Sequence, residues 1–351
     1  MRSALGLMLA SVVAAIVIAG VWFWTSSPRA DAAPPQTTAA AKADPLPAAA
    51  AKQAARDDVE TTAALSKRAD AAQATAPAAA PAPAPAPVTA APRCANPDAL
   101  GISRTVVVDT TGGPGFGFLQ YKQYDFLTDK EVVLTFDDGP WPTTPAVLKA
   151  LADECTKAVF FPIGLHTTYH PDILRQVAAA GHTIGAHTWS HAHLASKKLT
   201  EQQAKDEIEK GFSAVKLALG ANPAPFFRFP ALAHTPATTA YLGTRNIAMF
   251  SVDVDSNDFK SKSSDEVTNN VMTKLDKEHK GIILMHDLQK HTAQALPTLL
   301  RKLKAGGYKV VWMKAKTQIE TLPEYDAMMA KTEKPIATGR PIGNVVQTIA
   351  D

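Results

Sequence analysis

The sequence predicts an α/β protein in which about seven parallel strands form an incomplete (β/α) barrel. From residue 131 onward, short runs rich in β-branched and aromatic residues alternate with stretches that have helical spacing. Repeated β/α units favour a parallel sheet, and seven nearly uninterrupted units favour a barrel. An open, doubly wound sheet is the alternative architecture.

The expected strands are short and apolar, and each is followed by a helix candidate or a polar loop. They cover residues 131–137, 157–164, 182–187, 225–230, 247–253, 281–286 and 308–313. The expected helices cover residues 143–154, 171–180, 200–219, 236–244, 264–279 and 292–305. Residues 101–130 are expected to add a cap or hairpin, and residues 324–351 to form a weakly ordered tail. The globular domain is therefore predicted to span residues 94–323.

The first 27 residues are expected to address the protein for export. Residues Ala4 to Trp24 are almost continuously apolar, and two Trp residues stand at their far edge, as in a single bilayer span. We favour a retained membrane anchor over a cleaved signal peptide, because this run is longer than a usual signal core. Ala30-Asp31-Ala32 would be the cleavage site of the alternative. The globular domain would then lie in the periplasm or outside the cell.

Residues 28–93 are predicted to be a disordered linker rich in Ala and Pro. No Phe, Tyr or Trp occurs between Trp24 and Phe116, and 11 of the 26 prolines lie between Pro28 and Pro92. Such a segment has too few large apolar groups to build a core. The net charge of +3 and the pI near 8.7 are too mild to suggest a nucleic-acid partner. No protein partner is predicted either.

The chain has two cysteines, Cys94 at the start of the domain and Cys155 at the end of its first expected helix. In an exported protein such a pair forms a disulfide, so we expect one here. Two free, buried thiols are the alternative.

Polar residues gather where the expected strands end. In a β/α barrel the carboxyl ends of the strands share one face, so residues distant in sequence meet there. His187 and His191 lie four positions apart, so on a helical turn both imidazoles would face one cation. Asp137 and Asp138 are adjacent where a strand meets a loop, and the following Gly-Pro is expected to turn the backbone so that both reach one site.

Three further strand ends carry candidate residues. His286 ends an apolar strand, where a buried structural histidine is the alternative reading. Arg228 follows two Phe residues and needs an acidic partner if it is buried. Asp253 ends the fifth expected strand, and Asp255 follows it two residues later. Two His and one carboxylate would bind a divalent metal and leave positions open for water and substrate.

Taken together, five ordered motifs resemble a known family. TFDDGP, HTWSH, RFPA, DSNDF and LMH are similar to the motifs of the polysaccharide deacetylases of carbohydrate esterase family four, the NodB-homology domains. The resemblance covers residues 130 to 315 and implies a distorted (β/α) barrel. It also implies a divalent metal, with zinc expected and cobalt, nickel and manganese as alternatives.

The resemblance further implies a role for each site residue. Asp138, His187 and His191 would hold the metal. Asp137 would be the general base, positioned by Arg228, and His286 the general acid, supported by Asp255. Leu284 would line the pocket for the acetyl methyl group.

Two positions depart from the family pattern. The third motif normally ends in Tyr, but here Pro230 is followed by Ala231; the fourth normally ends in Trp, but here Phe259 stands there. If the family's Tyr contributes through its backbone N–H, Ala231 can do the same. The departures therefore change the surface that meets the sugar, to which we assign Pro230, Ala231 and Phe259.

The sequence thus predicts a metal-dependent hydrolase that removes N-acetyl groups from a glycan containing N-acetylglucosamine, either a chitooligosaccharide or a peptidoglycan-like polymer. The alternatives are an O-acetyl polysaccharide esterase, a catalytically inactive glycan-binding module and a metal-dependent phosphoesterase. The phosphoesterase would use the paired aspartates, but the sequence offers no basic phosphate cradle.

Overall fold

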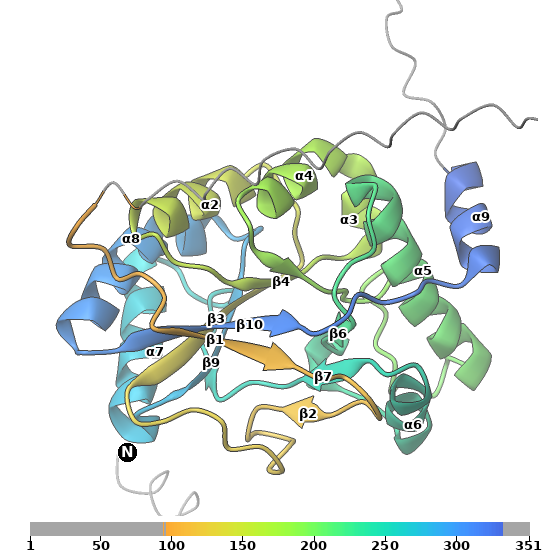
Figure 1. The fold of residues 1–351 in the computed structure, drawn as a ribbon, viewed down its shortest axis with the longest axis horizontal. Helices are drawn as coiled ribbons and strands as arrows, with labels where there is room; N and C mark the ends of the chain where they lie inside the picture. Colours follow the sequence, from red (N-terminus) through yellow and green to blue (C-terminus); the bar gives the residue numbers. More distant parts are fainter. Residues whose placement is uncertain (1–93, 95, 333–351) are drawn as a thin grey trace, which may run out of the picture. The chain divides into compact units, whose positions relative to one another are not determined.

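A computed structural model describes residue 94 and residues 96–332 of the chain (Figure 1). The expected anchor at residues 1–27 and the expected linker at residues 28–93 lie outside the described residues. So do residues 333–351 of the expected tail. Among the helices that the structure describes, none combines the length and the apolar composition that a bilayer crossing needs.

Every strand pairing in the described residues is parallel, which confirms the predicted class. The strands are β1 (Arg104–Val108), β2 (Gly115–Phe116), β3 (Glu131–Asp137), β4 (Val159–Phe161), β5 (Thr183–Ile184), β6 (Phe226–Phe227), β7 (Ala248–Phe250), β8 (Val254–Asp255), β9 (Gly281–His286) and β10 (Lys309–Ala315). One sheet has seven strands and the other has three.

The strands follow one another in an arc. In the larger sheet β9 and β4 both pair with β3, β8 pairs with β9, and β5 pairs with β4; β10 joins the start of β3 and carries β1 at the edge. The smaller sheet has the order β2-β7-β6. A bridge between Ala186, after β5, and Phe227 of β6 joins the two sheets. This succession is consistent with the expected incomplete barrel.

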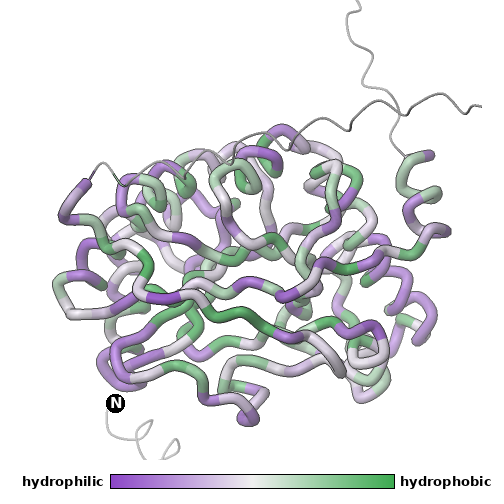
Figure 2. The backbone as a smooth tube through the Cα atoms, in the orientation of Figure 1, coloured by the Kyte–Doolittle hydropathy of each residue, from purple (hydrophilic) through white to green (hydrophobic). Residues whose placement is uncertain are grey.

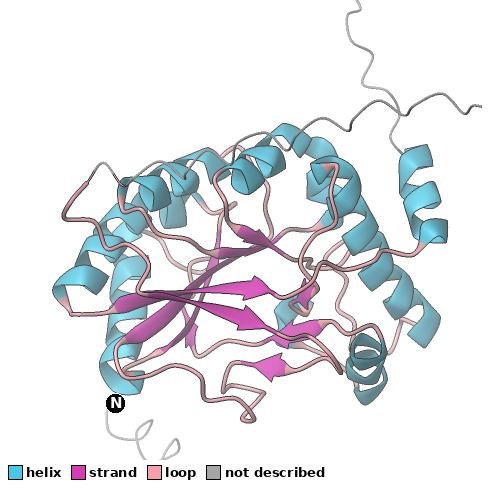
Figure 3. Ribbon diagram, viewed as in Figure 1, coloured by secondary structure: helices cyan, strands magenta, loops and turns pink. Residues whose placement is uncertain are grey.

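Helices cover the outer side of the strands, as Figure 3 shows with helices in cyan and strands in magenta. They are α2 (Thr144–Asp153), α3 (Gly164–Tyr169), α4 (Pro171–Ala179), α5 (Glu201–Leu219), α6 (Pro236–Thr244), α7 (Ser264–Glu278), α8 (Lys290–Ala305) and α9 (Pro323–Thr332), with a short 3-10 turn at Pro230–Leu232. Thr200 and Ser263 cap the first turns of α5 and α7 by accepting backbone N–H groups. All six expected helices are present.

Three expectations about the bounds of elements and of the domain need correction. Residues 101–130 do not form a hairpin; Arg104–Val108 adds a parallel edge strand to β10, over 200 residues away in sequence. The strands expected at residues 182–187 and 225–230 shrink to two residues each. The expected tail contains α9, which packs on α5 and buries Tyr325 and Met329. The domain therefore extends beyond residue 323.

Alternation along β3 divides the core in two. Val132, Leu134 and Phe136 join the cluster between strands and helices, whereas Val133 joins a second cluster inside the arc. Successive side chains of a strand point to opposite faces, so the odd-numbered positions of β3 face the interior. Figure 2 shows the apolar colouring of these central strands. The last interior position of β3 is Asp137.

The predicted disulfide between Cys94 and Cys155 is present, with the two Cα atoms 5.7 Å apart. It ties the start of the described domain to the residue after the α2 C-cap.

We predict that replacing both cysteines by serine lowers the free energy of unfolding by about 4 kcal/mol, because the bridge closes a loop of 61 residues in the unfolded chain. Urea denaturation of the oxidised protein measures this difference. The reduced wild type is the matched control and should unfold like the double variant. Equal stability of oxidised and reduced protein would contradict the prediction.

Candidate active site

Asp137 and His286 face each other because β3 and β9 pair in register. The ladder aligns Asp137 with His286, the last residue of each strand. In β9, Ile283 and Met285 belong to the outer cluster, so His286 shares the interior face with Ile282. Two ionisable side chains at the ends of adjacent parallel strands thus point into the same interior.

Arg228 lies at the centre of this interior and is fully buried. Its Nη1 donates to Asp137 Oδ1 at 2.7 Å and to Thr135 Oγ1 at 2.8 Å, and Nη2 donates to the carbonyl of Ser251. Its guanidinium also lies over the ring of Phe161, 4.6 Å from the centroid. A buried cation needs such compensation, and its anionic partner is Asp137. The structure therefore holds one oxygen of Asp137 fixed.

Asp138 reaches the same site through a left-handed backbone. Its φ of 72° turns the chain at Asp138 itself, one residue before the expected Gly-Pro turn. Without this turn Asp138 would point away from Asp137, as neighbours in a strand do. Asp138 Oδ1 instead lies 3.4 Å from the Nε2 atoms of both His187 and His191.

His187 and His191 do not lie on a helical turn, contrary to the sequence-based expectation. They belong to a loop after β5 in which Thr188 and His191 have positive φ values of 64° and 60°. This loop brings the two imidazole centroids within 5.0 Å. His187 Nδ1 donates to the carbonyl of Arg228 at 2.7 Å, which leaves Nε2 free to coordinate a cation.

These three side chains have the donor chemistry of a divalent metal site. One ligand atom from each of Asp138, His187 and His191 lies within 4.8 Å of the others. Asp138 Oδ1 is buried and has no hydrogen-bond partner in the described residues. Burial lowers the pKa of His187 more than the nearby carboxylates raise it, so the ring is in the neutral form that binds metals. The two nitrogens and one oxygen suit zinc.

His286 is supported by Asp258 and not by Asp255. Asp258 Oδ1 accepts from His286 Nδ1 at 2.7 Å, and its other oxygen accepts the backbone N–H of His286 and the hydroxyl of Thr292. Asp255 instead accepts the backbone N–H of Asn257. Asn257 has a φ of 51°, so the loop turns after Asp255 and directs Asp258 to the histidine.

The surroundings of His286 favour its protonated form. Burial lowers its pKa, but the hydrogen bond and charge of Asp258, together with Asp138 and Asp137, outweigh burial and raise the pKa to about 9. Burial raises the pKa of the Asp258 carboxyl, but the hydrogen bonds and charge of His286 and the bond from Thr292 outweigh burial and lower that pKa below its usual value. His286 therefore carries a proton at neutral pH and points Nε2 toward Asp138, 3.9 Å away.

Asp287 is a site residue that sequence reasoning missed. It is completely buried, which raises its pKa to about 7, and its Oδ2 accepts from Thr144 Oγ1 at 2.5 Å. Its carboxylate lies against Gly139, where an added Cβ would come within 2.1 Å of Oδ2. Gly139 is thus required for close approach, and Asp287 packs the turn that presents Asp138. Its position directly after His286 was the available signal.

The predicted substrate-binding residues occupy different environments. Leu284 is buried on β9, two residues before His286. Phe259 is 50% exposed and lies edge-on to His286, with ring centroids 5.7 Å apart. Pro230 is buried, whereas Ala231 is exposed in a left-handed conformation with a φ of 53°.

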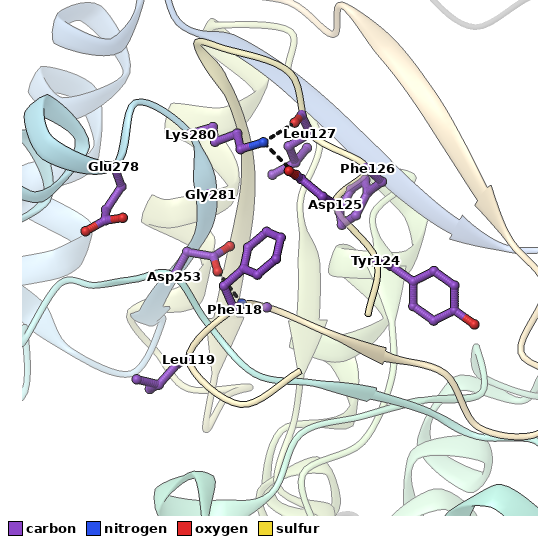
Figure 4. A pocket seen from close by; sticks show the side chains of 11 residues that line it. Phe118, Leu119, Tyr124, Asp125, Phe126, Leu127, Asp253, Glu278, Lys280 and Gly281 are labelled. Atoms are coloured by element: carbon purple, nitrogen blue, oxygen red, sulfur yellow. Dashed lines mark hydrogen bonds and ion pairs between the residues drawn. The ribbon is translucent and has the colours of Figure 1, made fainter. Parts of the chain in front are cut away.

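A cavity of about 300 Å³ lies at the other end of β9 and is not this site. Figure 4 shows Lys280 pointing to Asp125 and Leu127, below which lie the ring of Phe118 and the carboxylate of Asp253. Asp253 accepts the backbone N–H groups of Phe118 and Ile282, so its role is structural. Of the two carboxylates considered at this strand end, neither Asp253 nor Asp255 bonds His286.

Comparisons with known proteins identify the family of this fold. The family model described as polysaccharide deacetylase matches residues 126–248. A peptidoglycan-N-acetylglucosamine deacetylase of Bacillus cereus is 32% identical over 190 residues, which are 52% of this chain and 86% of that protein. The solved peptidoglycan deacetylase Bd3279 of Bdellovibrio bacteriovorus is 33% identical, with a TM-score of 0.55 over 61% of this chain and 59% of that one.

The chain belongs to the polysaccharide deacetylase family, as its motifs predict. Its match to the peptidoglycan-N-acetylglucosamine deacetylase PgdA of Listeria monocytogenes, 34% identical over 185 residues, covers 52% of this chain but spans only 38% of that relative's length.

We predict that the protein binds one divalent cation and that His191→Ala weakens this binding at least about tenfold, because the variant lacks one of three ligands. Titration calorimetry with Zn²⁺ measures the affinity, and the cation should also raise the melting temperature of the wild type. His193→Ala, two residues away and outside the cluster, is the matched control. Unchanged affinity in His191→Ala would contradict the assigned ligand set.

We predict that Asp258→Asn lowers the pKa of His286 in metal-free protein, because the variant removes the carboxylate of Asp258, whose hydrogen bond and charge are the largest of the effects that oppose burial. Imidazole NMR resonances followed from pH 5 to pH 10 measure the shift, with Asp255→Asn as control. Since the folded pKa exceeds the unfolded value near 6.5, this group's contribution to stability is complete below about pH 6.5 and is lost as the pH rises through about 9. A larger shift in Asp255→Asn than in Asp258→Asn would contradict the pairing.

Proposed function

We propose that this protein is an exported, metal-dependent hydrolase that removes N-acetyl groups from N-acetylglucosamine residues of a cell-envelope glycan. The observation that carries the proposal is the geometry around Asp138. The imidazoles of His187 and His191 lie near Oδ1 of its carboxylate, and the protonated His286 lies near Oδ2. Asp137, which precedes Asp138 in the chain, pairs with Arg228. Amide hydrolysis needs these groups: a base, an acid and a cation site with open positions.

Each residue has a distinct task in this reaction. When bound at Asp138, His187 and His191, a divalent cation supplies Lewis acidity and lowers the pKa of coordinated water. Asp137 accepts the proton of the attacking water through the oxygen that Arg228 does not bond. Arg228 keeps that carboxylate oriented.

The leaving amine needs a proton, because an amide nitrogen departs poorly as an anion. His286 lies on the interior face beside Asp137 and carries a proton at neutral pH, with Asp258 holding the other ring nitrogen. Ala231 is exposed in a left-handed turn, and its backbone N–H is assigned as a donor to the carbonyl oxygen.

Three observations support an extracellular glycan as substrate. Relatives that match this chain are named peptidoglycan-N-acetylglucosamine deacetylases. The Cys94–Cys155 disulfide is typical of oxidising compartments. The apolar run and Ala/Pro-rich segment before the domain, outside the described residues, favour export on a tether.

We predict that the purified domain releases acetate from N-acetylglucosamine oligomers and that Asp137→Asn or His286→Ala lowers turnover by about 10²–10⁴-fold, since each removes a proton-transfer group. Enzymatic detection of acetate measures the rate, and Zn²⁺ titration checks that metal binding persists in the variants. The exposed substitution Lys149→Ala, on the outer face of α2, is the control.

The same assay separates the proposal from its rivals. Parallel incubations with an O-acetylated polysaccharide and a panel of phosphoesters test the esterase and phosphoesterase readings. Glycan binding without release of any product would favour the inactive binding module. Full turnover in Asp137→Asn would refute its role as base.

A further inference from the structure

An aromatic cluster lies beside the backbone of the metal-ligand candidate Asp138. Trp141 follows Asp138 by three residues, and its ring packs against His166 and His170 of the α3 region, with centroids 4.9 and 5.1 Å away. His166 Nδ1 donates to the backbone carbonyl of Asp138 at 2.6 Å. The Trp141 ring is therefore one side chain removed from the backbone of a metal ligand.

Tyr169 extends this cluster toward solvent. Its ring lies 6.2 Å from His166, and its side chain is 55% exposed. Four aromatic side chains of the described residues are strongly exposed: Phe118, Tyr124, Tyr169 and Phe259. Phe118 and Tyr124 line the cavity at the far end of β9, so Tyr169 and Phe259 are the two that contact histidines at the site.

The position of the cluster is fixed by the catalytic turn. The backbone N–H of Trp141 donates to Thr144 Oγ1, and the same hydroxyl donates to Asp287. The first turn of α3 is tied to the loop that carries His187 and His191, because the N–H groups of Gly164 and Leu165 donate to carbonyls of that loop. Trp141 and Tyr169 are thus held in a constant relation to the metal ligands.

Aromatic rings are linked to both Asp138 and His286. The Phe259 ring lies edge-on to His286. Trp141 and Tyr169 both pack on His166, which donates to the backbone carbonyl of Asp138. The faces of a pyranose ring carry C–H groups, which gain dispersion and bury apolar area when they lie on an aromatic ring. A glycan strand that places one acetamide between Asp138 and His286 therefore meets an aromatic surface beyond each of them.

We infer that Trp141 and Tyr169 form an aromatic wall that binds the sugar next to the reacting N-acetylglucosamine and makes the site prefer oligomers to the monosaccharide. This inference rests on the proposed function. The wall comes from the loop after β3 and from α3, and so from a different strand end than Ala231 and Phe259.

Kinetics on the tetramer and monomer of N-acetylglucosamine test the wall. Tyr169→Ala and Trp141→Ala should raise KM for the tetramer and lower the tetramer-to-monomer ratio of kcat/KM roughly tenfold, the effect of one aromatic contact. Trp141→Phe should retain most of the ratio. Tyr124→Ala, which removes an exposed aromatic far from the site, is the matched control and should keep the wild-type ratio.

A merely structural role would give a different pattern. If Tyr169 only held His166 and thereby Asp138, its removal would lower activity on both substrates equally and weaken Zn²⁺ binding. An equal loss, or an unchanged ratio, would overturn the inference. Because the Tyr169 ring is exposed, its removal leaves no buried cavity, so this variant decides the matter even if Trp141→Ala does not fold.

Binding measurements separate this inference from the proposed function. In an Asp137→Asn background, calorimetry with the tetramer reports affinity without turnover. Asp137→Asn/Tyr169→Ala should bind the tetramer roughly tenfold more weakly than Asp137→Asn alone. Equal affinities, or no binding by either variant, would overturn the wall. Absence of acetate release by the wild type, with the affinity difference intact, would refute only the proposed reaction.

Discussion

The buried guanidinium of Arg228 is the constraint on which the site depends. It bonds Asp137 and Thr135 through its side chain, and its own carbonyl accepts Nδ1–H of His187. One residue thus orients the base and sets which nitrogen of a metal ligand is free. Leaving a buried charge unpaired costs about 3–5 kcal/mol, so neither Arg228 nor Asp137 can vary alone without loss of stability. The geometry of the base and that of the metal ligand are therefore coupled.

Sequence alone predicted the parts of this arrangement that follow from strand alternation. β3 and β9 have the expected bounds, and their alternation places Asp137 and His286 on one interior face. The parallel sheet was also predictable from the alternation of strand and helix patterns, and the disulfide from the presence of two cysteines in a chain expected to be exported. That a buried Arg228 needs an acidic partner followed from its apolar neighbours, and the family resemblance implied that this partner is Asp137, which it bonds in the structure.

The remainder depended on loop backbone that periodicity does not encode. Asp255 and Asp258 both stand in one motif, and only the turn at Asn257 decides which of them meets His286. Nor does the sequence show that Arg104–Val108 pairs with β10, because that contact joins segments more than 200 residues apart. The strands β5 and β6 have two residues each, and the segments that follow them carry His187 and Arg228, which are joined by a hydrogen bond.

Backbone strain concentrates where the chemistry lies. Ten non-glycine residues of the described chain have positive φ, and six of them lie in loops after strand ends that border the site: Asp138, Thr188, His191, Ala231, Leu232 and Asn257. Each such conformation costs roughly 1–2 kcal/mol, and a fold retains it only where the surrounding packing holds the backbone in place.

The backbone at Asp138 shows what such a conformation makes possible. Its left-handed turn lets two adjacent carboxylates reach one site with different neighbours, so that Asp137 faces a guanidinium while Asp138 faces two imidazoles. Asp258 then places a negative charge beside His286, the opposite polarity to that beside Asp137. A base beside a cation and an acid beside an anion can coexist a few ångströms apart only because each has its own buried counter-charge.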